Sequence, residues 1–383
     1  MSAAVINLEH TEDPRDAIHR AVAALAQGKI VAIPTETVYG LAASGLNESA
    51  VSRLFEIKGR ATTKGFALAV KSAEDALDYV PEMPALARRL ARRCWPGPIT
   101  LVLKDAHPDS VIRRLPAAVQ RAILQDGSGG LRVPANDVAL QILRLTVGPL
   151  VLTSANRTGE LEVADADRID DSIRNNVDLI IDSGPCRFGQ SSSVVRVRDY
   201  SFTILREGVV NADAIRQLSQ YIVLFVCTGN TCRSPMAERI FQKLLSEKLR
   251  CSTDKLPEQG VQILSAGMAA FPGGKPSREA VEILSRHGID LSNHSSQPLS
   301  ERLVRHADLI LAMTQAHMNS LLSQWPDAAG RSFLIRSDRQ DIDDPIGQPI
   351  GAYQHCADEI AAALRPWVDK VAAELHPAEM VNK

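Results

Sequence analysis

The run Tyr221–Cys227, YIVLFVC, constrains the fold of this chain more than any other segment. It is apolar at every position, which is typical of a strand that is covered on both faces of a parallel sheet. A short polar loop follows, and Ser234 and Pro235 then give the signals that usually begin a helix. Because parallel strands need crossover helices between them, this segment predicts an α/β domain with a central parallel sheet.

Similar strand-like runs alternate with helical patterns along the whole chain, which indicates α/β units with mostly parallel sheet in both halves. Helices are expected at residues 16–27, 84–93, 235–249 and 357–375. Strands are expected at 29–35, 99–104, 149–155, 178–184, 193–199, 202–208, 221–229, 261–267, 307–314 and 331–337.

The length of 383 residues favours two domains, and residues 206–220 contain the best boundary, where one strand ends and a new buried run begins. We expect domains at 1–218 and 219–378, with a short tail at 379–383. The net charge of −2 gives no sign of a protein that coats nucleic acid. No membrane span or secretory signal is apparent, so we predict a cytoplasmic protein that does not bind membranes.

Six cysteines in a chain of this size do not indicate a disulfide framework, and no Cys/His cluster has the spacing of a zinc site. No metal ligands are predicted. The loop Cys227–Arg233 has the pattern C-x5-R between a buried strand and a helix start. Such a loop points successive backbone N–H groups at an anion, and Gly229 and Asn230 tolerate the backbone that this requires.

At the base of this loop, Cys227 would be favoured as a thiolate that attacks phosphorus, while Arg233 would hold two phosphoryl oxygens with its fork of N–H donors. Asp344, held before Pro345, is the candidate general acid that protonates the leaving atom. Two plainer interpretations stay open from the residues alone: Cys227 as a small buried side chain, and Asp344 as part of a solvated acidic turn.

Residues 221 to about 375 resemble the low-molecular-weight protein tyrosine phosphatase family. The resemblance rests on VCTGNTCRSPMAE, on Ser265–Gly267, on ADLILAMT and on Asp344-Pro345, in the family's order. It implies Cys227 as nucleophile, Arg233 as phosphate clamp and Asp344 as general acid, with no cofactor. The remaining loop residues would organise the loop or set its specificity: Thr228, Gly229, Asn230, Thr231, Cys232 and Ser234.

Thr231 favours phosphoarginine over phosphotyrosine, because CTGNTCRSPMAE resembles the protein arginine phosphatase branch and a small hydroxyl suits a polar guanidinium. Ile346 departs from that branch, where a Phe is common, so phosphotyrosine stays open. Arsenate reductase chemistry is disfavoured because residues 290–324 hold no cysteine. Cys232 is close enough in the loop to form a disulfide with Cys227 under oxidant, or it simply fills the loop.

The first half places polar residues at the ends of predicted strands, where open α/β sheets bind ligands. Lys58 and Arg60 follow a helix and could bind phosphates. Taken singly, each of these segments is better explained as a capped or solvated polar turn.

Residues 12–218 nevertheless resemble the YrdC/Sua5 family of threonylcarbamoyl-AMP synthases, with which they share seven segments in order. The segments are KIVAIPTETVYGLAASG, LFEIKGR, CWPGPITLVL, LRVP, LTSANRTG, DSGPCRFGQSSSVV and ILREG. The resemblance implies a twisted open-sheet domain that binds ATP, with Mg²⁺, and L-threonine and bicarbonate. It implies that Thr35 and Thr37 border the threonine site. A polar tetrad would consist of Lys58, Arg60, Ser154 and Asn156. The adenylate and carboxylate contacts would come from Arg132, Ser192 and Arg206.

Two departures from that family concern the segment ATTKGFALAV and Arg196, which stands where an acidic residue is common. Together the two resemblances imply a bifunctional enzyme that forms threonylcarbamoyl-adenylate for the t6A modification of tRNA and dephosphorylates proteins. Its expected partners include a phosphorylated protein, tRNA and the t6A transferase machinery. The alternative is a phosphotyrosine phosphatase that carries a non-catalytic RNA- or nucleotide-binding module.

Overall fold

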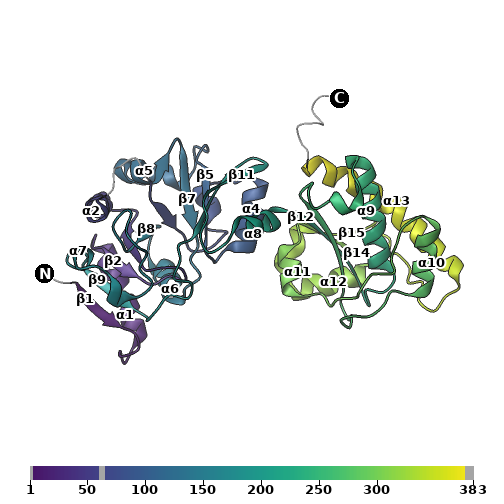
Figure 1. Ribbon diagram of the computed structural model, residues 1–383, viewed down its shortest axis with the longest axis horizontal. Helices are drawn as coiled ribbons and strands as arrows, with labels where there is room; N and C mark the ends of the chain where they lie inside the picture. Colours follow the sequence, from purple (N-terminus) through teal and green to yellow (C-terminus); the bar gives the residue numbers. More distant parts are fainter. Residues whose placement is uncertain (1–2, 60–64, 376–383) are drawn as a thin grey trace. The chain divides into compact units, whose positions relative to one another are not determined.

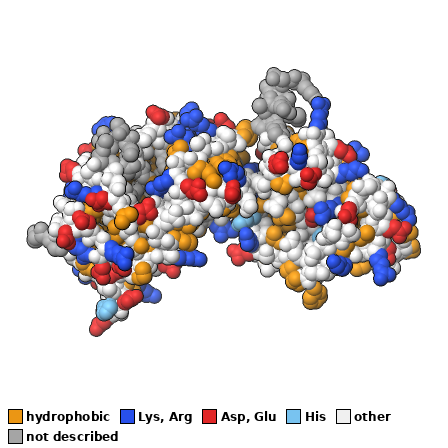
Figure 2. Space-filling view, in the orientation of Figure 1, with side chains coloured by type: hydrophobic (Ala, Val, Ile, Leu, Met, Phe, Trp, Pro, Cys, Tyr) orange, Lys and Arg blue, Asp and Glu red, His pale blue; other side chains and the backbone are white. Residues whose placement is uncertain are grey.

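The computed structural model describes residues 3–59 and 65–375. The chain forms two compact units, Met1–Leu218 and Ser219–Lys383, and each is built around its own sheet (Figure 1). The visible face of each unit carries Lys, Arg, Asp and Glu side chains interspersed with one another (Figure 2). Among the helices of the described part of the chain, none has the length and apolar character needed to cross a bilayer.

The first unit contains an 11-stranded mixed sheet in the order β1-β9-β2-β3-β8-β4-β7-β5-β10-β11, with β6 paired to β7. The strands are β1 (Ala4–Asn7), β2 (Val31–Ile33), β3 (Gly40–Ser44), β4 (Ala67–Ala69), β5 (Ile99–Lys104), β6 (Leu124–Gln125), β7 (Ser128–Arg132), β8 (Leu150–Ser154), β9 (Leu179–Asp182), β10 (Ser193–Arg198) and β11 (Ser201–Arg206). Its helices are α1 (Pro14–Ala26), α2 (Glu48–Lys58), α3 (Ala76–Tyr79), α4 (Ala85–Cys94), α5 (Ala117–Ile123), α6 (Asp137–Leu145), α7 (Asp171–Arg174) and α8 (Ala212–Ser219).

The prediction of a mostly parallel sheet is wrong for this unit. Only the pairs β1/β9, β2/β9, β4/β7 and β5/β10 are parallel, and the other pairs are antiparallel. The reason is that several connections are too short for a crossover helix. The turn between β10 and β11 is an example, because Asp199 takes a φ of 46° and the two strands pair as a hairpin.

Five strands of this sheet were not predicted from the sequence: β1, β3, β4, β6 and β7. Three of them are made largely of small residues, GLAAS, ALA and SGGLR, so they lack the β-branched runs that indicate strands. The sheet's two faces are covered by separate apolar clusters, one around Leu41, Leu68 and Leu101 and one around Ile33, Leu150 and Ile181.

The second unit contains a four-stranded sheet in the order β13-β12-β14-β15, and all of its pairs are parallel, as predicted. The strands are β12 (Tyr221–Cys227), β13 (Val261–Gly267), β14 (Leu309–Ala312) and β15 (Ser332–Leu334). The helices are α9 (Arg233–Leu249), α10 (Arg278–Arg286), α11 (Glu301–His306), α12 (Gln315–Gln324) and α13 (Ile350–Leu375).

The central strand β12 is buried along its whole length, which confirms the feature that the sequence analysis began from. Its alternate residues enter two different clusters. Val223 and Phe225 pack toward α9 and α13, whereas Leu224 and Val226 pack on the other face. Helix α13 begins at Ile350, seven residues before the predicted start at 357, and runs through Pro366.

Two candidate active sites

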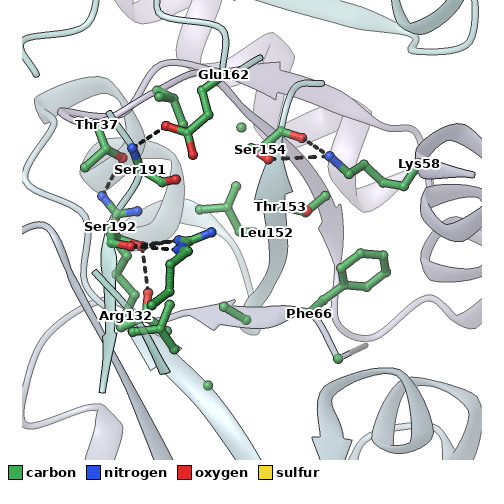
Figure 3. A pocket seen from close by; sticks show the side chains of 18 of the residues that line it. Thr37, Lys58, Phe66, Arg132, Leu152, Thr153, Ser154, Glu162, Ser191 and Ser192 are labelled. Atoms are coloured by element: carbon green, nitrogen blue, oxygen red, sulfur yellow. Dashed lines mark hydrogen bonds between the residues drawn. The ribbon is translucent and has the colours of Figure 1, made fainter. Parts of the chain in front are cut away.

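The first unit contains a cleft of about 680 Å³ that lies across one face of the sheet (Figure 3). Its floor comes from side chains that alternate along β3, β8, β4, β7, β5 and β10. Gly40 and Gly130 lie on this face, and an added Cβ at Gly40 would meet Leu152 Cδ1 at 2.8 Å. A larger residue at position 40 would therefore collide with the side chain of Leu152 in the floor of the cleft.

Eight of the nine site residues predicted for the first unit line this single cleft, and the ninth, Arg60, lies outside the described residues. The first and the last of them in the sequence, Thr35 and Arg206, are more than 170 positions apart. The eight are Thr35, Thr37, Lys58, Arg132, Ser154, Asn156, Ser192 and Arg206.

Thr37 and Arg132 meet at one wall of the cleft. Arg132 Nη2 donates to Thr37 Oγ1 at 2.9 Å and to Glu36 Oε1 at 2.8 Å. Glu36 also accepts from the backbone N–H of Ala135, and the Thr35 and Thr37 hydroxyls are 2.8 Å apart. All four of these side chains are buried, so the network holds its donors in place before any ligand arrives.

Lys58 and Ser154 lie on the opposite side of the cleft (Figure 3), and Asn156 lines the cleft beside them. The buried Lys58 ammonium donates to the Ser154 carbonyl at 2.8 Å, to Asn156 Oδ1 at 3.1 Å and to the Asn156 carbonyl. Lys58 is the last residue of α2, and Gly59 ends that helix in the left-handed conformation. The end of α2 thus places the Lys58 ammonium group beside the end of β8, where it contacts these oxygens.

Ser192 and Arg206 form a third group, just before β10 and at the end of β11. Arg206 Nη2 donates to the Ser192 carbonyl at 2.7 Å, and the Ser192 hydroxyl lies 3.0 Å from Thr100 Oγ1. Burial of its guanidinium lowers the pKa of Arg206 below its ordinary value, although nearby Glu162 acts in the opposite direction.

Sequence reasoning missed Glu36 and Glu162. Glu36 stands inside the segment PTETVYG but was passed over, and its pairing with Arg132 needs residues 96 positions apart. Glu162 lines the cleft, and its Oε2 accepts from the Ser191 N–H at 2.5 Å (Figure 3). No local pattern indicates that either carboxylate lies near a cation.

In the second unit, the loop after β12 wraps around the sulfur of Cys227. Cys227 Sγ lies 2.9 Å from Ser234 Oγ and accepts from the Asn230 N–H at 3.2 Å. Cys227 is only 3% exposed. Gly267, at the end of the neighbouring strand β13, must be a glycine because an added Cβ would lie 2.5 Å from the Thr228 carbonyl.

Asn230 braces this loop from inside, with a φ of 55°. Its side-chain amide donates to Ser234 Oγ and to Ser265 Oγ, both at 2.9 Å, and Ser265 in turn donates to Glu238. Its Oδ1 accepts from the Gln297 N–H. The loop is therefore held by hydrogen bonds to two other segments, β13 and the segment at Gln297, and such rigidity would suit an anion cradle.

Arg233 and Asp344, 111 positions apart, form an ion pair beside the loop. Arg233 also donates to the Ile342 carbonyl at 3.1 Å, so the guanidinium is anchored from the loop that carries Asp344. The Asp344 side chain keeps 41% of its surface exposed, whereas Arg233 is almost fully buried. An exposed carboxylate next to a buried cation can reach a leaving group at the mouth of the loop.

Thr231 and Cys232 complete the loop near α10. The Thr231 carbonyl accepts from the Ser277 N–H at 3.0 Å, and Thr231 Oγ1 lies 3.7 Å from Cys232 Sγ. Cys232 faces Ser277 and Tyr353, and both Cys227 and Cys232 are free thiols. Gly229 and Thr228 fill the loop's first positions.

His317 is a further residue near this loop that the sequence analysis missed. Its Nε2 lies 2.8 Å from Thr228 Oγ1 and its Nδ1 lies 2.9 Å from Thr314 Oγ1. Burial, together with the nearby positive charge of Arg233, lowers the pKa of His317 to about 4. A neutral imidazole therefore holds the first hydroxyl of the loop near neutral pH.

Within residues 3–59 and 65–375, no three His, Cys, Asp or Glu side chains are grouped so that they could hold a metal ion. Beside the first cleft, Glu36 is paired with Arg132, and in the cleft Glu162 accepts from the Ser191 N–H. These carboxylates do not form a cage for Mg²⁺.

Comparisons with known proteins match two separate regions of the chain, and each region contains one of the two sites. Residues 23–208 match the family of Sua5, YciO and YrdC proteins, described as Telomere recombination. Residues 222–377 match the family described as Low molecular weight phosphotyrosine protein phosphatase.

Individual relatives agree with these families. A threonylcarbamoyl-AMP synthase of Pyrococcus abyssi is 36% identical over 197 residues, which cover 50% of this chain and 54% of that protein. The chain thus spans about half the length of this relative. A protein-arginine-phosphatase of Bacillus subtilis is 39% identical over 147 residues, which cover 37% of this chain and 91% of that protein.

A solved structure of a P. abyssi Sua5 variant shares the fold, with a TM-score of 0.51 at 22% identity over 87% of this chain and 99% of that chain. Together, the two matched regions take in both sites described above. The chain belongs to two enzyme families at once, the Sua5/YciO/YrdC family in its first part and the low-molecular-weight phosphotyrosine protein phosphatase family in its second.

Proposed function

We propose that the chain is a bifunctional enzyme. Residues 1–218 form threonylcarbamoyl-adenylate from ATP, L-threonine and bicarbonate, and residues 219–378 hydrolyse a phosphorylated protein through a cysteinyl-phosphate. The observation that carries the first activity is the single cleft in which eight predicted residues meet. The observation that carries the second is the braced loop around Cys227 with Arg233 and Asp344 beside it.

The first reaction needs positioning more than acid–base chemistry. Carbamoylation of the threonine amine makes a carboxylate, which attacks the α-phosphate and releases pyrophosphate. Arg132, Arg206 and Lys58 are already anchored, so they can stabilise the charge that develops without rearranging. Mg²⁺ would arrive bound to the phosphates of ATP as part of the substrate. The product would then serve tRNA modification together with the t6A transferase machinery.

In the second reaction the Cys227 sulfur attacks phosphorus, and the bond to the leaving atom breaks as Asp344 gives that atom a proton. Water activated by the same Asp344 carboxylate then releases phosphate from the sulfur. The hydroxyl of Ser234, 2.9 Å from the sulfur, can stabilise the thiolate as it leaves. No step of this reaction uses a cofactor.

We infer that phosphoarginine is the preferred substrate and that phosphotyrosine is the alternative. The residue type at Thr231 supports this preference because a small hydroxyl suits a polar guanidinium, and the similarity to a protein-arginine-phosphatase also supports it. We expect the protein to act in the cytoplasm, where arginine-phosphorylated and tyrosine-phosphorylated proteins would both be available to it.

Two assays on the intact chain test these proposals. Pyrophosphate release from ATP should require both threonine and bicarbonate; release that ignores either of them, or none at any protein concentration, contradicts the synthase. Phosphate release from phosphoarginine should exceed that from phosphotyrosine in kcat/KM; the reverse order makes phosphotyrosine the substrate. The two assays fail independently of each other.

A further inference from the structure

Arg196 lies in the cleft of the first unit with part of its side chain buried and unpaired. Along β10, Val195 and Val197 point into the core and are 0% and 2% exposed, whereas Val194 and Arg196 are half-buried and line the cleft. The Nε atom of Arg196 is buried, and it has no hydrogen-bond partner within the described part of the chain.

The other cleft cations differ from Arg196 in this respect. Lys58, Arg132 and Arg206 each donate to carbonyl or side-chain oxygens of the protein. Arg157 also lines the cleft, but it is exposed, so water can satisfy its donors. A buried donor without a partner is unfavourable, and a ligand that supplies the acceptor removes this cost.

We propose that Arg196 binds the β- and γ-phosphates of a nucleoside triphosphate, the part that leaves as pyrophosphate. The proposal rests on the ATP-dependent function proposed above and assigns a residue to one part of that substrate. The fork of a guanidinium matches two phosphoryl oxygens, and Nε–H is one of the donors in that fork.

Charge in the cleft favours a polyanion over a carboxylate with a single charge. Among residues 3–59 and 65–375, five cationic side chains line it, Lys58, Arg132, Arg157, Arg196 and Arg206, against two acidic ones, Glu160 and Glu162. Glu36 neutralises Arg132, which leaves a surplus of two positive charges. A triphosphate can take up such a surplus, whereas threonine and bicarbonate together carry too little negative charge.

The distance between Arg196 and the Ser192–Arg206 group favours an extended ligand. Ser192 and Arg196 project from the same face, and four strand residues separate their backbones by about 13 Å. A ligand that contacts both the Ser192–Arg206 group and Arg196 must span much of this distance, even after the long arginine side chain is allowed for. A nucleotide with a phosphate tail is long enough, and a free amino acid is not.

Binding measurements with inorganic pyrophosphate, AMP and ATP test the proposal on the full chain. Arg196→Ala should weaken pyrophosphate and ATP binding about 10-fold or more, while AMP binding changes less than about 2-fold. Arg196→Lys keeps the positive charge but loses the guanidinium fork, so its affinity for pyrophosphate should lie between those of the wild type and Arg196→Ala. Arg198→Ala is the matched control, because Arg198 is exposed on the same strand. Urea unfolding followed by far-UV circular dichroism verifies that the first unit of each variant is folded.

Unchanged pyrophosphate binding in Arg196→Ala overturns the proposal. An equal loss of AMP and pyrophosphate binding also overturns it, because the residue would then contact the nucleoside end. If the wild type releases no pyrophosphate with threonine and bicarbonate, but pyrophosphate binding still depends on Arg196, the synthase proposal fails and the assignment of Arg196 stands.

Discussion

The two sites of this chain are built in opposite ways. In the second unit, the proposed nucleophile and the proposed anion cradle come from one stretch, Cys227–Ser234, and only Asp344 and the groups that hydrogen-bond to the loop come from elsewhere. The cleft of the first unit collects single side chains from strands and a helix spread over residues 35–206. A site of the first kind is encoded locally, and a site of the second kind exists only when the whole sheet has formed.

The physical consequence concerns how each site fails. Removal of one group from the local loop should abolish its reaction while the unit stays folded. Removal of one group from the dispersed cleft should weaken both binding and folding, because the same side chains satisfy each other's buried hydrogen bonds. The predictions that follow test this difference, from the largest expected effect to the smallest.

Cys227→Ser should lower phosphatase kcat by a factor on the order of 10⁴ or more, because a serine hydroxyl is a far weaker nucleophile than a thiolate. Threonine-dependent pyrophosphate release should not change. Both reactions are measured on one preparation, with Cys251→Ser, which alters a half-buried cysteine away from the loop, as the control. A comparable loss of pyrophosphate release would show that the two sites are not autonomous.

Lys58→Met should lower pyrophosphate release by about 10²-fold, because a positioned cation is lost. It should also destabilise the first unit by about 2–3 kcal/mol, since the Ser154 and Asn156 oxygens lose a buried donor. Urea unfolding and the two activity assays measure these effects. Lys104→Met changes an exposed lysine at the end of β5 and should leave both quantities near the wild-type values. A Lys58→Met variant that is inactive but as stable as the wild type would contradict the claim that the same side chains serve both binding and folding in this cleft.

Thr231→Ile should change the ratio of phosphoarginine to phosphotyrosine kcat/KM by about 10-fold toward phosphotyrosine, because an aliphatic rim favours an aromatic ring over a guanidinium. Serine at the same position keeps the hydroxyl and should preserve the ratio. The measurement is kcat/KM for both substrates in all three proteins. If isoleucine and serine alter the ratio equally, the Thr231 hydroxyl does not decide specificity.

His317→Gln should make the second unit less sensitive to acid. The pKa of His317 in the folded protein is about 4, below the ordinary value of 6.5, so the unfolded chain binds the proton first as pH falls. The stabilisation that this residue contributes is therefore complete above about pH 6.5 and decreases as pH falls toward 4, by about 2.5 kcal/mol at pH 4.5. Urea unfolding at pH 7, 5.5 and 4.5 should show a shallower decline in the variant. His355→Gln, at an exposed position, should keep the wild-type slope, and a variant slope as steep as the wild type's contradicts the prediction.

Much of the second unit could be predicted because its signals are local. A fully apolar run predicts a central parallel strand, and a polar loop with Ser234-Pro235 after it predicts the turn into a helix. Each inference needs only neighbouring residues and the rule that parallel strands are connected through helices. The contact between Arg233 and Asp344 could be expected as chemistry, but its geometry depends on a loop 111 positions away.

The first unit shows what such reasoning leaves out. Short strands of glycine and alanine, such as β3 and β4, carry no β-branched signal, yet they form the floor of the cleft. Antiparallel pairing replaces the expected parallel sheet, because pairing depends on which strands meet in space and not on their own composition.

By itself, the sequence determined that two α/β domains follow one another and which side chains in each are suited to bind phosphate. Only the tertiary structure decided which of those side chains face one another, that Glu36 neutralises Arg132, and that the buried Nε of Arg196 has no partner within the described residues. The reason is physical: the chemistry of a side chain is a property of one residue, whereas its burial and its partners depend on residues far away in the chain.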